Sequence, residues 1–480
     1  MHPAQRISVG GSLGTVRFVG AVPAWPGVTA VGVEWDDPAR GRHSGTLDGV
    51  QYFACSVPGA GSFVKATKVD GAVDFATALR AKYTAQADDD DDIAFGSKRA
   101  ERVGFDKYRA RISQLDRLQV AGLDHMCIDA SSPGLTALCP ELVEVDLSFN
   151  LFESLAPVHA ICVQLPRLHT LKLAGCRLAD LGPAPPAPPP PFVGVETVWL
   201  AATLPHAPTL ATLPRLFPDA QTCLLGGNAL AFASLDFGLW NVTALDLSDN
   251  KLTEFPDLRG LPRLRTLLLA HNAIAAAPKA AVVASSLEEL DLRHNALASW
   301  ADVDALAATF AGVTSVRLRW NPVTASVPER EAHTLVIGRW GGRLGLLDGV
   351  RVAPAERLDA ELYLHHRVNA GTAPMDRTSP RWLELVAAHG AAPEPAARPS
   401  MRSSLVQLTL VHGERRLIKT VPRTTPVRRL RVMVARWLSL PADLTLTVAA
   451  AGGRPPELMA DPIQIVGYYA VDDVVDVFVS

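Results

Sequence analysis

Glycine and aromatic residues are concentrated near the N-terminus, where their types and spacing favour the binding of a peptide. The glycines are Gly10, Gly11, Gly14, Gly20, Gly27, Gly32, Gly41, Gly45, Gly49, Gly59 and Gly61. The aromatic residues are Phe18, Trp25, Trp35, Tyr52, Phe53 and Phe63. Glycine lets a loop turn tightly and lets another backbone approach closely, and aromatic rings beside such loops form an apolar groove. We therefore predict a peptide groove here, although Trp35 and Phe63 also suit the core of so small a module.

The sequence contains no set of residues that suggests catalysis. No pair of carboxylates and no Ser/His/Asp set converges, and no Lys-Ser/Thr pair follows Gly-x-x-x-x-Gly as a phosphate-binding loop requires. His365 and His366 are adjacent, so on a helix they point to different faces and do not suit a metal. The six cysteines form no C-x-x-C pair and are predicted to be reduced thiols. We therefore expect a binding protein rather than an enzyme, with no cofactor and no metal.

Short apolar runs punctuated by glycine and proline predict that residues 4–71 form a small all-β barrel. Residues 14–18 and 30–35 are two such runs, both rich in β-branched or aromatic side chains. Five consecutive aspartates, Asp88–Asp92, come next, and a block of like charge favours an extended, solvated segment. Residues 72–106 are therefore predicted to be an acidic linker.

A repeat of the form L-x-x-L-x-L-x-x-N-x-L dominates the middle of the chain. Its clearest copy is Leu287–Leu297. Other copies begin at Leu142, Leu168, Val242, Leu264 and Val313, and weaker ones at Val195 and Ala220. This spacing is typical of leucine-rich repeats, in which a short strand turns alternate side chains inward and the Asn bonds the turn that follows. Residues 107–345 are predicted to form an α/β solenoid, capped by a helix over Lys107–Leu118 at its start and another over Arg330–Trp340 at its end.

One outward-facing residue of each repeat strand contributes to a row on the concave face of this solenoid. Trp199, Leu224 and Leu268 are large apolar side chains in the row. The charged residues at its far end and in the neighbouring row are Asp291, Arg293, Arg317 and Arg319. Exposed apolar clusters with a charged rim usually mark partner surfaces. We predict that these residues contact a protein partner, unless a loop such as the proline-rich insertion Pro183–Pro191 covers the apolar ones.

The last part of the chain is predicted to contain a connector and a small separate domain. Residues 346–401 are the connector, which ends in a stretch rich in Ala and Pro. In residues 402–480, strands are predicted at 405–411, 415–421, 444–448 and 474–479, with a helix at 427–438. This β-β-α-β order resembles a ubiquitin-like β-grasp fold.

Composition narrows the range of partners. The chain has 480 residues with a formal net charge of −3, and 48% of its residues are hydrophobic, which is typical of several globular domains. The lack of a basic excess argues against nucleic acid and against an anionic membrane. No apolar run is long enough to span a bilayer, and the start of the chain has no signal-peptide character. We expect a cytoplasmic protein that binds neither nucleic acid nor membrane.

The N-terminal segment resembles a CAP-Gly domain. The matching motifs are Gly11-x-x-Gly14, residues 32–35, Gly41-Arg-His-Ser-Gly45, residues 49–55 and residues 61–69. The resemblance implies a domain that binds acidic C-terminal tails ending in an aromatic residue, as on α-tubulin. The residues it implies in contact with the tail are Trp35, Gly41, Arg42, His43, Gly45, Phe53, Phe63 and Lys65. Arg42 keeps a cation for the carboxylates and His43 a hydrogen-bond donor, whereas Ser44 replaces an acid of the family's motif.

The order of the domains resembles the tubulin-folding cofactor E family over nearly the whole chain. The resemblance implies a non-enzymatic, cytoskeleton-associated cofactor that binds the α-tubulin tail through the CAP-Gly domain and the tubulin body through the repeats. It would help to assemble or dissociate αβ-tubulin heterodimers. The implied partners are α-tubulin and tubulin-folding cofactors B, C and D, and the resemblance leaves open a proteasome or ubiquitin-pathway protein as a partner of residues 402–480.

Two alternative functions remain open from the sequence. The first is a microtubule plus-end linker without chaperone activity, although such linkers usually add coiled coils and no sustained heptads occur here. The second is a ubiquitin-pathway adaptor that uses the repeats as its substrate receptor.

Overall fold

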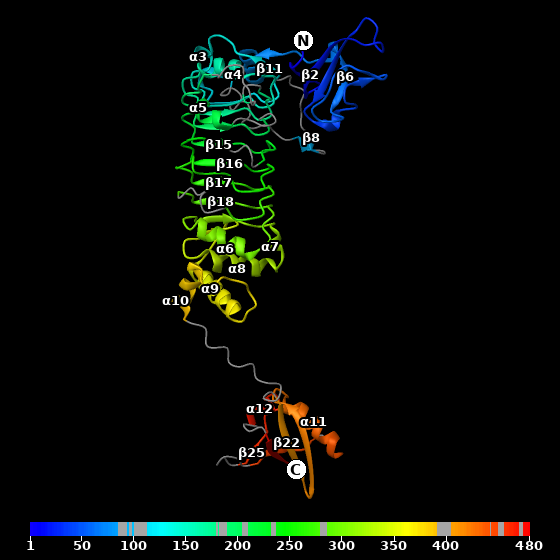
Figure 1. Ribbon diagram of the computed structural model, residues 1–480, viewed down its shortest axis with the longest axis vertical. Coiled ribbons are helices and arrows are strands. Elements are labelled where there is room, and N and C mark those ends of the chain that lie inside the picture. The colour runs from blue at the N-terminus through cyan, green and yellow to red at the C-terminus, as the bar shows by residue number, and fades with distance from the viewer. Residues whose placement is uncertain are drawn as a thin grey trace. The chain divides into compact units, whose positions relative to one another are not determined.

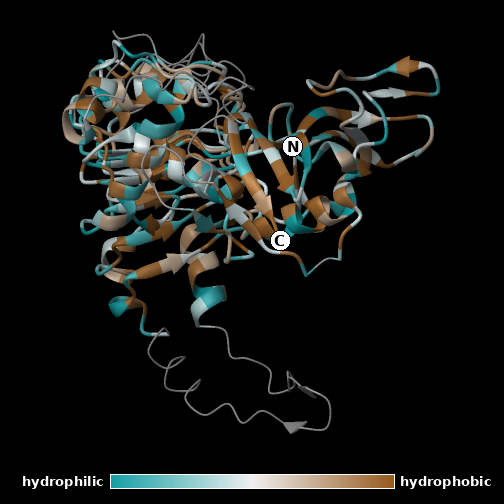
Figure 2. Ribbon diagram, turned by 90° about the horizontal axis from the view of Figure 1, so that it is seen from below, coloured by the Kyte–Doolittle hydropathy of each residue, from teal (hydrophilic) through white to brown (hydrophobic). Residues whose placement is uncertain are grey.

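The chain forms two compact units in a computed structural model, Met1–His389 and Gly390–Ser480 (Figure 1). The structure describes residues 1–84, 94–95, 98–99, 113–178, 181, 190–203, 210–231, 237–278, 286–390, 405–441, 443–449, 456–469 and 474–480. The run Asp88–Asp92 and most of the insertion Pro183–Pro191 lie outside these residues. Hydrophobic residues, brown on the ribbon of Figure 2, recur along the strands and helices. Among the described residues, no helix is both long and apolar enough to cross a bilayer.

The N-terminal barrel is built on an antiparallel sheet. Its strands pair in the order β1-β2-β3-β6. Their bounds are β1 Arg6–Val9, β2 Ser12–Ala21, β3 Thr29–Trp35 and β6 Gly61–Lys65, with a small hairpin of β4 Thr46–Leu47 and β5 Val50–Gln51 and the 3₁₀ turns η1 Pro38–Arg40 and η2 Ala66–Lys68. Alternate β-branched residues such as Val16, Val31 and Val33 are fully buried against Ile7 and Trp35. This confirms the predicted small all-β fold.

The solenoid begins with a helix that the sequence analysis assigned to the linker. Strand β7 (Val73–Asp74) pairs in parallel with β11 (Ile128–Ala130), and helix α1 (Phe75–Tyr83) follows directly. The Asp74 carboxylate caps α1 by accepting the backbone N–H of Thr77 at 2.9 Å, as expected for an N-cap aspartate. Phe75 and Leu79 are fully buried in the solenoid core. The prediction that residues 72–106 form a linker is therefore wrong for residues 73–83.

The helix predicted over Lys107–Leu118 lies partly outside the described residues, so its role as a cap stays a prediction. Residues 107–112 lie outside the described part of the chain, and only a 3₁₀ turn, η3 (Leu115–Arg117), is present after them. Between α1 and η3, β8 (Ala94–Phe95) and β9 (Lys98–Arg99) form an antiparallel pair. Helix α1 packs on the first repeats through Phe75 and Leu79, which lie on one of its faces.

The solenoid carries one continuous sheet, visible as stacked short strands in Figure 1. Its strands from β10 to β20 pair in parallel, and β21 returns antiparallel. Their bounds are β10 Val120–Gly122, β12 Glu144–Asp146, β13 Thr170–Lys172, β14 Thr197–Trp199, β15 Thr222–Leu224, β16 Ala244–Asp246, β17 Thr266–Leu268, β18 Glu289–Asp291, β19 Ser315–Arg317, β20 Leu346–Leu347 and β21 Val350–Arg351. The middle residue of each repeat strand, such as Leu171 or Leu290, is fully buried. The predicted repeat solenoid is confirmed.

An asparagine at a fixed position in most repeats links two neighbouring turns of the solenoid. The Asn295 side-chain amide donates to the carbonyls of Leu292, at 3.1 Å, and Leu269 in the preceding repeat, at 2.8 Å. Its oxygen accepts the backbone N–H of Ile274 at 3.0 Å. Asparagine occupies this position at Asn150, Asn228, Asn250, Asn272, Asn295 and Asn321, whereas Cys176 and Thr203 occupy it in two other repeats. These bonds satisfy buried backbone groups that have no partner in the sheet.

The convex side and the C-terminal end of the solenoid are helical. The short helices are α3 Leu135–Leu138, α4 Leu155–Cys162, η5 Leu210–Thr212, α5 Leu213–Leu216, α6 Trp300–Thr309 and α7 Pro322–Ala325. The terminal layer contains α8 Glu329–Trp340, α9 Pro354–Asn369 and α10 Pro380–His389. At Gly338, a Cβ would lie 2.8 Å from the carbonyl oxygen of Ala360, so glycine lets α8 and α9 cross closely. Much of the predicted connector therefore belongs to the first unit.

The C-terminal unit has the predicted β-grasp order. Its sheet has the order β23-β22-β26-β24-β25, and β22 and β26 are parallel neighbours. The element bounds are β22 Leu405–His412, β23 Arg415–Pro422, α11 Val427–Leu438, β24 Leu446–Val448, β25 Glu457–Leu458, α12 Val466–Tyr469 and β26 Val474–Val479. Leu430 and Val434 of α11 are fully buried against Leu408 and Leu410 of β22.

We expect Asn295→Ala to destabilise the solenoid by roughly 2–4 kcal/mol, because buried carbonyls and an N–H group lose their hydrogen-bond partners. Urea denaturation of the full chain measures this change. The exposed Asn241 provides a matched control, and Asn241→Ala should change stability by less than about 0.5 kcal/mol. Equal effects of the two substitutions would contradict the structural role of the repeat asparagine.

Candidate peptide groove and partner surface

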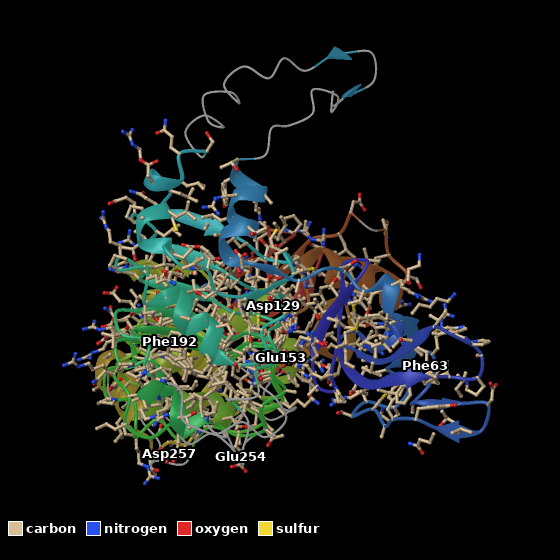
Figure 3. All side chains as sticks on the ribbon, turned by 90° about the horizontal axis from the view of Figure 1, so that it is seen from above. Phe63, Asp129, Glu153, Phe192, Glu254 and Asp257 are labelled. Carbon is tan, nitrogen blue, oxygen red and sulfur yellow. The ribbon has the colours of Figure 1, made fainter. Side chains whose placement is uncertain are left out.

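A groove of about 480 Å³ opens on the barrel beside the loop Gly41–Gly45. Side chains that line it include Trp25, Trp35, Arg40, Arg42, His43 and Phe63. Figure 3 shows Phe63 within the barrel sheet. The groove therefore combines an aromatic lining with exposed guanidinium groups, which suits a peptide that carries both an apolar side chain and carboxylates.

Glycine is needed at both ends of the loop. A Cβ on Gly41 would lie 2.0 Å from the carbonyl oxygen of Gly59, and one on Gly45 would lie 2.0 Å from that of Phe53. Gly45 also has a φ of +101°, which other residues rarely adopt. Between them, the backbone N–H of Arg42 donates to the carbonyl of Gly61 at 2.7 Å. These contacts fix the loop so that Arg42 and His43 stand beside the groove.

His43 lies in the groove as a neutral hydrogen-bonding group. Its Nδ1 accepts the backbone N–H of Gly45 at 3.0 Å, which requires an unprotonated Nδ1 and leaves the hydrogen on Nε2. Its ring lies 5.4 Å from Phe63 and 6.1 Å from Phe53, measured between centroids. Burial lowers the pKa of His43 below its usual 6.5. The imidazole can thus donate one hydrogen bond to a ligand near neutral pH.

Four aromatic rings stack edge to face behind the groove. Phe63 contacts Tyr52, Phe53 and Phe18 with centroid distances of 5.5, 5.4 and 6.0 Å. Phe53 is only 7% exposed, whereas Phe63 is half-buried. Phe53 therefore packs behind Phe63 in the barrel, and Phe63 forms the accessible surface of the groove.

A buried carboxylate holds the loop that packs against Gly41. Glu34 is 1% exposed and accepts Arg17 Nε at 2.7 Å and the backbone N–H groups of Ser56 and Val57 at 2.7 and 3.1 Å. Burial raises the pKa of Glu34, but the bonds from Arg17 and the two N–H groups outweigh burial and lower it. The ionised carboxylate thus stabilises the loop, and acid would remove this stabilisation as the pH falls through the folded-state pKa.

The residues predicted to hold a tail have different positions in the groove. Trp35 is 2% exposed yet lines the groove, so it serves both the core and the surface. Arg42 is exposed at the rim, and the Lys65 ammonium lies 5.7 Å above the Trp25 ring. Gly41, Gly45 and Phe53 do not form the lining of the groove. They hold the lining residues in position. Arg40 lines the groove but was not predicted, and Trp25 was noted only as one of the aromatic residues of the module, because both lie outside the motifs on which the resemblance rests.

The apolar residues predicted on the solenoid lie on the outward face of its sheet. Trp199 is 37% exposed, and Leu224 and Leu268 are half-buried. The strand register places Trp199 beside Leu224, whereas Asp246 lies between Leu224 and Leu268. The Lys172 ammonium is 4.5 Å from the centre of the Trp199 ring, a cation–π contact. The apolar surface therefore consists of an adjacent pair and a separate leucine.

The charged end of this row is paired within the chain. Asp291 is 2% exposed and contacts Arg293 at 2.6 Å and Arg317 at 3.5 Å. Arg317 also contacts Glu289 at 2.9 Å, and Arg319 contacts Glu329 at 2.7 Å. Asp291 therefore orients the arginines instead of facing a partner. The arginines remain partly exposed, with 30–44% of their side-chain surface accessible.

Three rings that the sequence analysis did not assign stack along one edge of the sheet. His271, His294 and Trp320 occupy the same position in successive repeats, immediately before the repeat asparagine. Their centroids are 4.1 and 4.4 Å apart, and Trp320 is 56% exposed. This position holds Phe149 in an earlier repeat and Gly, Ala or Asp in the other repeats, so the recurrence of rings at this position is a signal that the sequence analysis did not use. Among the described residues, no group of His, Cys, Asp and Glu could hold a metal ion.

Family models match two parts of the chain. Residues 4–69 match the CAP-Gly domain and residues 227–373 match a leucine-rich repeat. Tubulin-specific chaperone E of Xenopus laevis is 27% identical over 98% of this chain and 96% of its own length, and the Homo sapiens protein is 28% identical over the same shares. The chain is related to tubulin-specific chaperone E.

Two further proteins are similar to parts of this chain. Protein PAC2 of Saccharomyces cerevisiae is 28% identical over 80% of this chain and 76% of its own length. A solved structure, the C-terminal ubiquitin-like domain of mouse tubulin-specific chaperone e, is 20% identical, with a TM-score of 0.15, and covers 16% of this chain and 84% of the solved chain. The relatives of this chain from Xenopus laevis and Homo sapiens are named as chaperones.

We expect the barrel to lose stability as the pH falls below 6.5, because the unfolded chain takes up a proton on His43 before the folded chain does. Amide hydrogen exchange of β2 and β3 in the full chain measures this loss. His43→Gln should show a smaller change between about pH 7.5 and pH 5.5, since the other titrating groups are common to both proteins. Identical pH dependence in the two proteins would show that His43 does not contribute.

Proposed function

We propose that this chain is a tubulin-folding cofactor that binds α-tubulin at two sites. The groove of the barrel holds the acidic tail, and the outward face of the solenoid sheet contacts the folded body. The groove carries this proposal, because it combines aromatic lining residues with a rim of cations next to a large solenoid. The names of the relatives, tubulin-specific chaperone E, support the same ligand.

The chemistry of the groove suits an acidic peptide that ends in an aromatic residue. Arg42 and Lys65 are exposed at its rim and would attract carboxylates. Trp25 and Phe63 offer ring faces and edges between which an aromatic side chain can pack. The Nε2–H of His43 can donate to a carboxylate or carbonyl of the peptide.

The solenoid surface suits a folded partner rather than an extended tail. Trp199 and Leu224 form an adjacent apolar pair, and Leu268 adds a third contact two strands away. The partly exposed arginines Arg293, Arg317 and Arg319, with Asp291 beneath them, would form the charged rim of the interface. Large aromatic residues and arginines are the side chains that most often dominate interface energetics.

Two linked sites would give tighter binding than either alone. Once the tail occupies the groove, the tubulin body is confined near the solenoid, which raises its effective concentration. The barrel ends near Val69, and β7 of the solenoid begins at Val73, so only a few residues join the domain with the groove to the solenoid. A tail bound only by exposed charges would be weak and sensitive to salt.

The proposed function also includes a location in the cell and further protein partners. The chain would act in the cytoplasm, in association with the cytoskeleton, and would help to assemble or dissociate αβ-tubulin heterodimers. Tubulin-folding cofactors B, C and D would be its partners in that process. The β-grasp unit would recruit a further partner, for which a proteasome or ubiquitin-pathway protein is the candidate.

Sedimentation separates this function from the alternatives. A microtubule plus-end linker would co-sediment with microtubules and leave their amount unchanged, whereas a cofactor of this kind would reduce the amount of polymer. A ubiquitin-pathway adaptor would do neither. A chain that co-sediments without reducing the polymer would overturn the proposed chaperone role.

We expect Arg42→Glu to weaken binding of an α-tubulin tail peptide by at least about tenfold, because an attraction for carboxylates becomes a repulsion. Binding of whole tubulin should be reduced but not abolished, since the solenoid contact remains. Fluorescence anisotropy measures both affinities. Lys68→Glu makes the same charge change at an exposed position outside the groove and should have little effect. Loss of both kinds of binding in equal measure would contradict a second site.

We expect the double substitution Trp199→Ala and Leu268→Ser to weaken the binding of whole tubulin and not that of the tail peptide, which is the opposite of the effect of Arg42→Glu. Affinity for whole tubulin should fall by about tenfold or more, because an aromatic anchor and an apolar contact are removed, whereas affinity for the tail peptide should not change. Val193→Ser provides a control on an exposed apolar residue outside the row. Unchanged binding of whole tubulin by the double variant would place the second contact elsewhere.

A further inference from the structure

The barrel packs directly against the first repeats of the solenoid, and a cleft of about 320 Å³ lies at this junction. The barrel contributes Leu13, Trp35 and Arg40, and the solenoid contributes His125, Phe149 and Arg177. His2 of the barrel also lies 3.8 Å from Glu153, which Figure 3 shows at the side of the solenoid that faces the barrel.

The cleft and the peptide groove have two lining residues in common. Trp35 and Arg40 line both. The Arg40 guanidinium lies 4.2 Å above the Trp35 ring and donates to the carbonyl of Val9 at 3.0 Å and to the Ser12 hydroxyl. Its charge is thus held at the boundary between groove and cleft by neutral partners. A chain that leaves the groove over Arg40 would enter the cleft.

Two guanidinium groups share one carboxylate where the cleft meets the solenoid, and Asp37 also lines the cleft. The Asp36 carboxylate is bound by Arg6, through both of its oxygens, and by Arg177, whose Nε is 3.3 Å from it. One carboxylate therefore serves two guanidinium groups. Arg6 is buried, but 43% of the Arg177 side chain is exposed, so Arg177 can also contact a carboxylate of a ligand.

The solenoid wall of the cleft offers flat rings and an open backbone. His125 and Phe149 stack with centroids 4.6 Å apart, and Phe149 is 37% exposed. The Phe149 ring lies over Gly175, where a Cβ would be 2.3 Å from it. A ring held at this position leaves a smooth wall along which an extended peptide can lie.

We propose that the cleft is a second subsite for the acidic tail. The first repeats of the solenoid would then contact the residues that precede the end of the tail. The end of the peptide occupies the groove on the barrel. Its preceding acidic residues pass Arg40 and meet Arg177. This inference rests on the proposed function, and it assigns part of tail recognition to residues outside the CAP-Gly domain.

The length of the peptide tests this proposal. A short acidic peptide with a terminal aromatic residue fills only the groove, whereas one with about eight further acidic residues reaches roughly 25 Å beyond it when extended. With the full chain at low salt, the longer peptide should bind about fivefold more tightly than the short one. In Arg177→Gln, this advantage should largely disappear while the affinity for the short peptide stays unchanged, and Arg177→Lys should restore part of it.

A matched control and the contrary outcomes separate the two proposals. Arg167→Gln removes an exposed arginine of the solenoid that pairs with Glu141 and should preserve the advantage of the longer peptide. If the short peptide binds but the longer one binds no better, or if Arg177→Gln weakens both equally, the cleft is not a subsite, although the groove is. If neither peptide binds, the proposed function of the groove fails as well.

Discussion

The solenoid depends on the hydrogen bonds of its repeat asparagines. Each buried Asn side chain bonds backbone groups of its own repeat and of the preceding one, as Asn295 does with Leu292 and Leu269. Strands of three residues leave the turns without sheet partners, and the asparagine supplies these partners. The stacking of repeats, the outward row with Trp199, and the platform against which the barrel packs all follow from this interaction.

A second constraint fixes the barrel to that platform. Strand β7 pairs with β11, and α1 inserts Phe75 and Leu79 into the core of the first repeats. The groove is thereby carried on the same compact unit as the solenoid sheet. Two weak contacts with one ligand can then reinforce each other, since binding at one site limits the freedom of the ligand at the other.

Charge is distributed differently over the two candidate surfaces. The arginines at the end of the solenoid row are paired with Asp291, Glu289 and Glu329, so a partner would gain little from their charge alone. Around the groove, Arg40 is held by a ring, a hydroxyl and a carbonyl. The basic character that an acidic tail requires is therefore located on the barrel and its junction, while the solenoid row offers apolar contacts.

The sequence by itself determined the barrel, the repeat register and the β-grasp order, because each depends on local periodicity and on glycines that permit only certain backbone paths. It also indicated Arg42, His43 and Phe63 beside the groove, since these belong to one short motif or its neighbourhood. Only the tertiary structure decided that α1 packs on the first repeats, that Asp291 is buried under its arginines, and that Trp25 and Arg40 complete the groove. Each of these depends on contacts between segments far apart in the chain, for which a local pattern contains no signal. The cleft of Arg40 and Arg177 is the clearest case, because its walls come from two domains whose packing no repeat or motif encodes.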